Sequence, residues 1–493
     1  MAEVLLGMLD FGKSDAKFEA EKSNFTSLFF DDKDYFKRLN EENCFIIYGY
    51  KGTGKTMLSN YFSKQKEKTS SVKKMYAGDF IQEKLLSFSK TPIAKEELII
   101  FWKYVYLKQL GRMITENIEK KSFLFFRQKR KIKKLHSLLN EVQMIVDKTE
   151  SIIENTNSVS SSGNFTTAPV AKFGLSSSKS SKQNLKSENI RANYMNLIQE
   201  LESEVLKNLK INDEYYMIFD DMDQLEETLE RDDFVELTKQ MIYSADYFND
   251  MLRARRLNVR VIHVMRSDIL ELIIESSNNL IKTVTDFGIE IDWYAESQKN
   301  PENHPLMQMI IHKVRNTIPQ YKNLDNKEIY NQLFNRDETI LQYILNVSFG
   351  RPREIVRYLD IVKRKYPDSR KITLKMLESC VSDYSKWFYE SMLSEIKINT
   401  YSEEIKFILN LIRVRGSKRF TYSKLIKYAN KKSGVVLPDN LMLVLQEMFK
   451  LGILAILNDT GKIELYYRKN APQTANEHTK FVVHYGFINY LNL

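Results

Sequence analysis

Short, almost wholly apolar runs alternate with longer amphipathic stretches over residues 1–300. Continuous apolar runs are typical of strands buried on both faces, whereas an apolar residue at every third or fourth position is typical of a helix with one buried face. The runs predict five strands, at 44–48, 73–77, 215–219, 259–265 and 288–293. The helical spacing predicts helices at 94–117, continuing to about 148, and at 188–209 and 232–252. Strands joined by long helical crossovers predict an α/β fold with a parallel sheet.

Two further regions follow this predicted sheet. Residues 304–363 have a helical pattern with a break at Phe349-Gly350-Arg351-Pro352, where Pro352 suits the first turn of a new helix. The last region predicts helices at 403–413, 422–432 and 439–451, a short strand at 418–421, and a hairpin that pairs 453–457 with 462–467. This order of elements is that of a winged helix. We therefore expect a core at 1–300, with a helical insertion at about 90–210 that contains a serine-rich linker at 151–187, then a helical lid at 301–395 and a winged-helix domain at 396–493.

Composition narrows the class of protein. A chain of 493 residues with 43% hydrophobic residues, 16 Gly and 9 Pro is expected to be helix-rich and to have more than one domain. The two cysteines are Cys44 and Cys380, and Cys44 lies in a predicted buried strand, so no disulfide framework is expected. No apolar run approaches the roughly 18 residues of a membrane span, and Asp10 and Lys13 interrupt the apolar start. We expect a cytoplasmic protein with no membrane partner.

The net charge of +10 is unevenly distributed. Residues 401–493 contain 14 Lys/Arg and 7 Asp/Glu. A second basic cluster consists of Lys120, Lys121, Arg127, Lys129, Arg130, Lys131, Lys133 and Lys134. Such clusters are compatible with a polyanionic partner, and a solvated surface explains them equally well.

The segment Gly49-Tyr50-Lys51-Gly52-Thr53-Gly54-Lys55-Thr56 follows the first predicted strand. It has the spacing of a phosphate-binding loop, in which two glycines four residues apart precede Lys and Ser/Thr. Glycines allow the backbone N–H groups to approach a phosphate, the lysine reaches the outer phosphates, and the hydroxyl is a Mg²⁺ ligand. The sequence therefore predicts binding of ATP and Mg²⁺, with nucleotide contacts from Gly49, Lys51, Gly52, Thr53, Gly54, Lys55 and Thr56.

Polar residues end the two later apolar strands. Asp220 and Asp221 follow the strand at 215–219, and ligand sites of parallel sheets lie at the carboxyl ends of the strands. Asp220 is expected to hold Mg²⁺ together with Thr56, and Asp221 to act as general base on the attacking water. Arg266 ends the strand at 259–265, where it would sense the outer phosphate. The alternative is that Ser267 and Asp268 cap a helix there while Arg266 is solvated.

A further arginine is expected from the helical lid. Arg353 lies at the start of the helix that Pro352 begins, where it would swing onto a nucleotide phosphate, with Arg351 as the second choice. A structural ion pair explains either arginine about as well. The expected catalytic set is Lys55, Asp221, Arg266 and Arg353.

Together these motifs resemble the additional-strand P-loop ATPases, with AAA+ initiators of the origin-recognition type and STAND ATPases as the nearest relatives. Five segments resemble more narrowly a bacterial family of stand-alone P-loop ATPases often found in defence neighbourhoods: Phe11-Gly12 with Asp15-Ala16, 50–56, Met265–Ile269, Arg351–Glu354 and Val483–Gly486. The resemblance implies that Arg353 is a sensor-two residue. Two departures stand out: Asp221 replaces the usual Glu, which favours slow hydrolysis, and Arg266 replaces the usual Asn or Thr.

The predicted winged helix has basic residues on its flanks rather than on its third helix. That helix offers only Asn440, Gln446, Glu447 and Lys450 as polar side chains, which favours weakly specific, phosphate-driven binding of DNA by 401–493 over sequence readout. Docking of a protein is the equal alternative. A homo-oligomer or a separate effector protein is also a candidate partner. The resemblance to initiator-type ATPases implies a finger that acts on a neighbouring subunit, and four arginines lie near the end of the helix at 232–252: Arg253, Arg255, Arg256 and Arg260. A solvated basic helix end that interacts favourably with the helix dipole is the somewhat stronger alternative.

The expected function is that of an ATP-binding and ATP-hydrolysing switch that couples nucleotide state to binding of DNA or a partner protein. A role in anti-phage defence is implied by the resemblance alone. The alternative is a non-enzymatic adaptor whose binding of DNA or protein depends on nucleotide.

Overall fold

The computed structural model describes residues 3–41, 43–76, 95–121, 132–141, 195–227, 229–277, 279–295, 300–335, 339–468 and 474–493. The predicted linker at 151–187 and half of the basic cluster, Arg127, Lys129, Arg130 and Lys131, lie outside these residues. The chain forms two compact units. The sheet unit comprises residues 35–49 and 58–290, and the helical unit comprises 1–34, 50–57 and 291–493.

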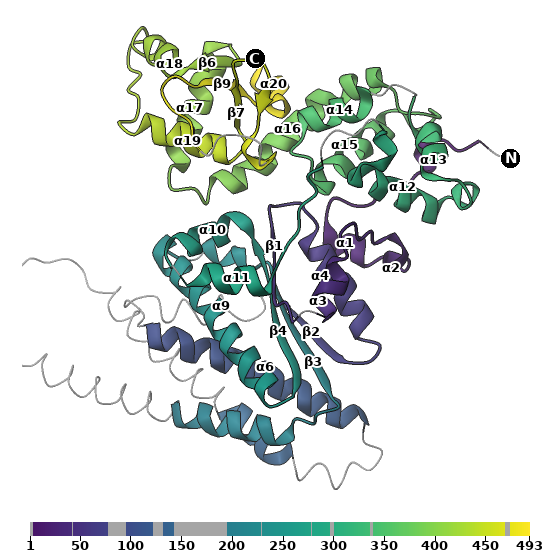
Figure 1. Ribbon diagram of the computed structural model, residues 1–493, viewed down its shortest axis with the longest axis vertical. Coiled ribbons are helices and arrows are strands. Elements are labelled where there is room, and N and C mark those ends of the chain that lie inside the picture. The colour runs from purple at the N-terminus through teal and green to yellow at the C-terminus, as the bar shows by residue number, and fades with distance from the viewer. Residues whose placement is uncertain are drawn as a thin grey trace, which may run out of the picture. The chain divides into compact units, whose positions relative to one another are not determined.

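The sheet unit is built on a five-stranded parallel sheet (Figure 1). Its strands are β1 (Ile46–Gly49), β2 (Ser71–Tyr76), β3 (Glu214–Asp220), β4 (Asn258–Arg266) and β5 (Gly288–Glu290). Their order across the sheet is β2-β3-β4-β1-β5, and each pairing is parallel. The α/β class and the parallel sheet are thus confirmed, and each observed strand overlaps a predicted one.

Helices cover both faces of this sheet. On one face, Tyr106 packs against Phe219 with their ring centroids 5.4 Å apart, and its hydroxyl lies 3.0 Å from Nε2 of His263. On the other face, Phe62 packs edge-on against Tyr216, with ring centroids 5.1 Å apart. The alternation along β3 separates the two faces, since residues 216 and 219 point to opposite sides of a strand. The helices of this unit are α3 (Tyr35–Glu41), α4 (Lys55–Lys66), α6 (Lys95–Lys121), the 3₁₀ turn η3 (Met222–Glu227), α9 (Arg231–Ala254), α10 (Ser267–Glu275) and α11 (Leu280–Phe287).

The helical unit contains the N-terminal residues as well as the predicted lid. Nζ of Lys313 lies 2.6 Å from a carboxylate oxygen of Glu19, and both side chains are buried. Backbone bonds at Leu6 and Gly7 join the N-terminal segment to Ser369 and Pro367. Residues 1–34 therefore pack with helices that follow residue 300, whereas the sequence analysis grouped them with the core at 1–300. The N-terminal elements are η1 (Leu6–Met8), α1 (Ala16–Ala20) and α2 (Phe25–Leu28).

We call residues 301–396 the helical region. The predicted break is present, because α15 begins at Pro352 after Gly350, which has a positive φ of 74°. The elements of this region are η4 (Pro301–Asn303), α12 (Pro305–Thr317), η5 (Pro319–Tyr321), α13 (Asn326–Leu333), α14 (Thr339–Val347), α15 (Pro352–Lys365) and α16 (Leu374–Ile396).

The C-terminal α/β region, residues 402–491, combines helices with a four-stranded antiparallel sheet of order β6-β9-β7-β8. Its helices and strands are α17 (Ser402–Arg415), β6 (Arg419–Thr421), α18 (Tyr422–Ala429), α19 (Leu441–Lys450), β7 (Leu454–Leu457), β8 (Ile463–Glu464), η6 (Tyr466–Arg468), β9 (Lys480–Val483) and α20 (Tyr485–Leu491). The predicted second arm of the hairpin was too long, since β8 ends at Glu464 and a 3₁₀ turn follows. Strand β9 and helix α20 were not predicted. Across the described ranges, no helix is both long and apolar enough to span a membrane.

Candidate functional site

The glycine-rich loop, residues 50–54, joins β1 to α4. Gly52 and Gly54 have φ values of 84° and 101°, a region that side chains disfavour. A Cβ added to Gly54 would meet no heavy atom within 4 Å, so the loop faces open space there. A Cβ added to Gly52 would lie 2.9 Å from Cβ of Arg353. The two glycines therefore meet different needs: Gly52 allows close packing against the helical region, and Gly54 borders space that a ligand can fill.

Three consecutive carbonyls of the loop accept hydrogen bonds within the helical unit. The O atom of Lys51 accepts from Nη1 of Arg351 at 3.1 Å, that of Gly52 from the backbone N–H of Arg353 at 3.3 Å, and that of Thr53 from Nε1 of Trp293 at 2.7 Å. The C=O and N–H of a trans peptide point in opposite directions. The N–H groups of Gly52 and Gly54 therefore point away from the side on which the carbonyls are held.

The lysine that the motif assigns to phosphate contacts its own loop. Nζ of Lys55 donates to the carbonyl of Tyr50 at 2.8 Å, and the hydroxyl of Thr53 donates to the same oxygen at 2.9 Å. Thr56 follows in the first turn of α4. A bond from an ammonium to an uncharged carbonyl can be exchanged for one to a phosphate, because a charge-assisted bond to an anion is stronger.

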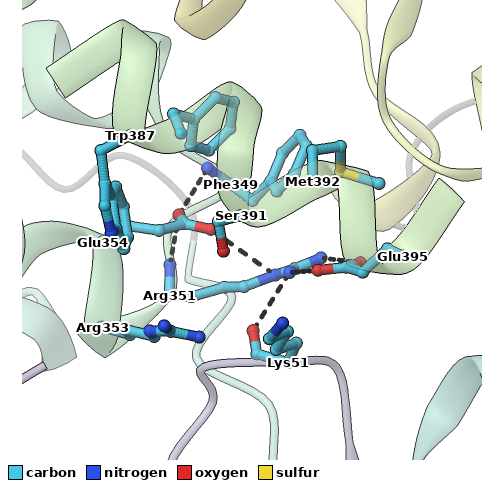
Figure 2. Close-up of a pocket in the computed structure, with 10 residues that line it drawn as sticks. Lys51, Phe349, Arg351, Arg353, Glu354, Trp387, Ser391, Met392 and Glu395 are labelled. Carbon is cyan, nitrogen blue, oxygen red and sulfur yellow. Dashed lines mark hydrogen bonds and ion pairs between the residues drawn. The ribbon is translucent and has the colours of Figure 1, made fainter. Parts of the chain in front are cut away.

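The turn before α15 is held by a buried carboxylate (Figure 2). Oε2 of Glu354 accepts from the backbone N–H groups of Phe349 at 2.8 Å and Arg351 at 3.2 Å. Burial raises the pKa of Glu354 to about 7, more than the neighbouring guanidinium of Arg351 lowers it. The carboxylate thus fixes the backbone from which Arg351 and Arg353 project.

Arg351 is a buried member of an ion pair. Its Nη1 lies 2.8 Å from Oε1 of Glu395, and its guanidinium lies over the rings of Phe349 at 4.7 Å and Tyr50 at 5.3 Å. Burial disfavours its charge, but the attraction of Glu395 and Glu354 outweighs burial and raises the pKa of Arg351. Arg351 is therefore charged and fixed between the glycine-rich loop and α16.

Arg353 is held less tightly than Arg351. Its guanidinium lies 5.7 Å from the ring centre of Trp387, and its buried Nε has no hydrogen-bond partner among the described residues. Burial lowers the pKa of Arg353, more than the attraction of the Asp15, Glu354 and Glu395 carboxylates raises it. Both arginines line a small pocket with Lys51 and Trp387 (Figure 2). Of the two arginines, Arg353, the first choice from the sequence, is thus the one whose buried Nε has no hydrogen-bond partner among the described residues.

In the sheet unit, Asp220 ends β3 and is 1% exposed. Its Oδ2 lies 2.8 Å from Nζ of Lys74 and accepts from the hydroxyl of Ser59 at 3.1 Å. The ammonium of Lys74 also contacts Ser59 at 2.7 Å and Asn60 at 2.6 Å. A cation thus neutralises the carboxylate that the sequence assigns to Mg²⁺.

Asp221 follows in an unusual backbone conformation. Its φ is 57°, a left-handed value that Asp tolerates better than most residues, and its N–H donates to Oδ1 of Asp220 at 2.9 Å. The 3₁₀ turn η3 begins at the next residue, Met222.

Arg266 is buried rather than solvated. Its Nε donates to Oδ1 of Asp268 at 3.0 Å, and Nη1 lies 3.5 Å from Asp223. In the register of the sheet, Arg266 lies beside Gly49 of β1. The sheet unit therefore brings Gly49, Arg266 and Asp220 to one edge, where the strands have their carboxyl ends.

The predicted finger arginines do not form one group. Arg253, Arg255 and Arg256 are exposed at the end of α9, and Arg253 pairs with Asp250. Arg260 lies within β4, where it donates to the backbone carbonyl of Leu39 and lies over the ring of Tyr216 at 5.8 Å. Arg260 is therefore unsuited to a neighbouring subunit.

The basic residues of the C-terminal region are partly structural. Arg468 donates to the carbonyl of Leu345 at 3.0 Å, and Lys418 lies 5.4 Å from the ring centre of Tyr485. On α19, Leu443 is 54% exposed, so the third helix presents an apolar side chain outward. Burial lowers the pKa of His484 to about 3, and this neutral ring accepts from the N–H of Gly486 at 3.1 Å at the start of α20.

Several residues at these sites were missed from sequence: Trp293, Glu395, Trp387, Lys74 and Ser59. Each acts through a partner far away in the chain, and only Lys74 carries a local signal. It is a lysine in a predicted strand, where a charged side chain needs a partner or solvent.

Comparison with known proteins covers part of the helical region. A family model described as a FunZ-associated C-terminal helical domain matches residues 304–393. This segment lies within the helical lid predicted at 301–395 and contains Arg351 and Arg353. No match was found among curated proteins.

Proposed function

We propose that this protein is an ATP-binding and ATP-hydrolysing switch of the additional-strand P-loop class. The observation that carries the proposal is the strand order of the sheet. Strand β4 lies between β1, which leads into the glycine-rich loop, and β3, which ends in Asp220. An additional strand at this place defines the class, and the carboxyl ends of parallel strands are where ligands bind.

The glycine-rich loop supports binding of phosphate. The carbonyls of Lys51 and Thr53 are held by Arg351 and Trp293, so the N–H groups of Gly52 and Gly54 point away from these donors, and the position of a Cβ on Gly54 is open. Lys55 and the first turn of α4 add positive charge and a helix N-terminus. In the proposed complex Lys55 releases the Tyr50 carbonyl and binds the outer phosphates.

The donor set suits Mg²⁺. A hydroxyl from Thr56 and a carboxylate from Asp220 are hard oxygen ligands, and Mg²⁺ in nucleotide sites completes its shell with phosphate oxygens and water. No group of three or more His, Cys, Asp or Glu side chains that could hold a metal occurs among the described residues. Mg²⁺ would therefore enter with the nucleotide and supply charge neutralisation. The pairing of Asp220 with Lys74 at 2.8 Å indicates that this carboxylate needs a cation partner.

Asp221 is the proposed general base. Its side chain is one methylene shorter than the Glu usual in related ATPases, so an attacking water is held less closely. Slow turnover follows, which suits a switch better than a motor.

Helix α16 supports coupling between nucleotide and the C-terminal α/β region. Near its end Glu395 and Ser394 contact Arg351 and Lys51 at the loop. Ten residues before Glu395, Ser385 donates to the carbonyl of Gly486 in α20 at 2.6 Å. One continuous helix of 23 residues thus contacts both the glycine-rich loop and the region proposed to be a winged helix.

The test is isothermal titration calorimetry with ATP. Lys55→Ala should abolish binding, and the control Lys68→Ala, an exposed lysine beyond α4, should leave it unchanged. Undiminished affinity in Lys55→Ala would refute the assignment.

A non-enzymatic adaptor is the second candidate function. Steady-state ATPase measurements distinguish it from the switch, since an adaptor binds ATP without turnover. Measuring the rate with and without double-stranded DNA over a salt series also tests the partner, because phosphate-driven binding weakens steeply with salt. An unchanged rate would favour a protein partner, in agreement with the exposed Leu443 on α19.

A further inference from the structure

The glycine-rich loop is held from its carbonyl side by residues that no phosphate-binding motif contains. The donors are the guanidinium of Arg351, the backbone of Arg353 and the indole of Trp293. Each carbonyl that they hold belongs to a peptide group whose N–H points the opposite way. Arg351 and Trp293 therefore set the direction of the N–H groups of Gly52 and Gly54, whereas the N–H of Thr53, which belongs to the peptide group held by Arg353, donates to the Tyr50 carbonyl at 3.3 Å.

We propose that Arg351 and Trp293 are positioning residues that fix the carbonyl side of the loop and thereby set its affinity for nucleotide. This inference rests on the proposed function for its ligand, the phosphates of ATP or ADP. Neither residue needs to contact the nucleotide. Arg353, in contrast, has an Nε without a hydrogen-bond partner in the part of the chain that the structure describes, and is the arginine suited to contact the nucleotide.

Both positioning side chains are themselves fixed. Arg351 is 8% exposed and is anchored by Glu395 at 2.8 Å. Trp293 is also 8% exposed, and its ring packs against Phe30 with centroids 6.3 Å apart. A donor that is buried and anchored loses little further freedom when it holds the loop, so the loop is ordered before any ligand arrives.

Loop order also depends on close packing at Gly52. The 2.9 Å separation between its Cβ position and Cβ of Arg353 places the start of α15 against the loop backbone. The Lys51 side chain adds a contact to Ser394 of α16. Two helices thus fix the same short stretch that the three donors hold.

The test uses hydrogen exchange of the nucleotide-free protein followed by mass spectrometry, and calorimetry with ATP and with ADP. Trp293→Phe keeps an aromatic ring and removes the indole donor. Arg351→Lys keeps the charge beside Glu395 but loses the fork that reaches the Lys51 carbonyl. Trp387→Phe, a change beside Arg353 rather than at a loop carbonyl, is the matched control.

We expect faster exchange at residues 50–57 in Trp293→Phe and Arg351→Lys but not in Trp387→Phe. Affinity for ATP and for ADP should fall by the same factor, about 2- to 10-fold for the loss of one hydrogen bond. Arg353→Met should instead weaken ATP more than ADP, because it removes a contact to the ligand.

Unchanged exchange in both positioning variants would overturn the inference, and so would faster exchange with unchanged affinity. Failure of the wild-type protein to bind either nucleotide would refute the proposed function instead. In that case the exchange measurement would still decide whether Arg351 and Trp293 hold the loop.

Discussion

Replacing Gly52 and Gly54 by alanine, one at a time, should damage different properties of the protein. Both residues have positive φ values, so each change forces alanine into a disfavoured backbone conformation at about 1–2 kcal/mol. Only at Gly52 does the new methyl group also collide with a neighbour, Cβ of Arg353 at 2.9 Å. A Cβ lies next to the backbone and cannot rotate away, so this overpacking adds about 1–3 kcal/mol.

The total loss of stability is therefore about 2–5 kcal/mol for Gly52→Ala and about 1–2 kcal/mol for Gly54→Ala. The variant that loses less stability, Gly54→Ala, should lose more affinity for nucleotide. The methyl group of Gly54→Ala fills the open space in front of the loop, so ATP should bind at least about tenfold more weakly, equivalent to 1.4 kcal/mol, although the protein remains folded.

Urea denaturation of each variant measures stability, and calorimetry with ATP measures affinity. Equal losses of stability would refute the reasoning about contact between Gly52 and Arg353. Unchanged affinity in Gly54→Ala would show that phosphate does not occupy the space beside this glycine, and the loop would then need another ligand.

Three further changes test the buried charges. Burial raises the pKa of Glu354 to about 7 in the folded protein, so its protonated form stabilises the fold at low pH. This contribution of about 3 kcal/mol is complete below pH 4.5 and is lost as the pH rises to 7. In urea denaturation from pH 5 to 7, Glu354→Gln should therefore show a smaller decline in stability than the wild-type protein. Lys74→Met removes the ammonium beside buried Asp220 and should lower the free energy of unfolding by about 3 kcal/mol. Added MgCl₂ should restore part of this stability in thermal melts. No effect of Mg²⁺ would argue against a metal at Asp220. Asp221→Asn should keep ATP affinity and abolish phosphate release, and retained turnover would exclude Asp221 as the base.

The predicted elements that depend on local pattern agree well with the structure. Strands β1, β3 and β4 follow from apolar runs, β2 and β5 overlap the shorter predicted strands at 73–77 and 288–293, and Pro352 marks the start of α15. Strand β9 was not predicted, and its place between β6 and β7 comes from pairing with segments far along the chain. Short strands of this kind are defined by their partners.

The same distinction applies to the candidate site. Gly52, Gly54 and Lys55 could be proposed from sequence because a phosphate-binding loop has fixed local spacing. Trp293 lies 240 residues from the carbonyl that it holds, so no spacing rule indicates it. Lys74 is likewise separated by long helices from Asp220. Residues that bind ligand leave a sequence motif, whereas residues that position them are defined by the fold.

Three arginines were candidates for a phosphate contact, and their surroundings differ. Arg266 is balanced by Asp268 and by Asp223, so moving it onto a phosphate would leave two carboxylates without that partner. Arg351 is bound to Glu395 and to the loop itself, and its removal from a buried carboxylate would be costly. Arg353 has neither constraint: within the described ranges its buried Nε has no hydrogen-bond partner, and its aromatic neighbour tolerates movement. A side chain that responds to nucleotide must be free to exchange partners, and among these three arginines Arg353 meets that condition best.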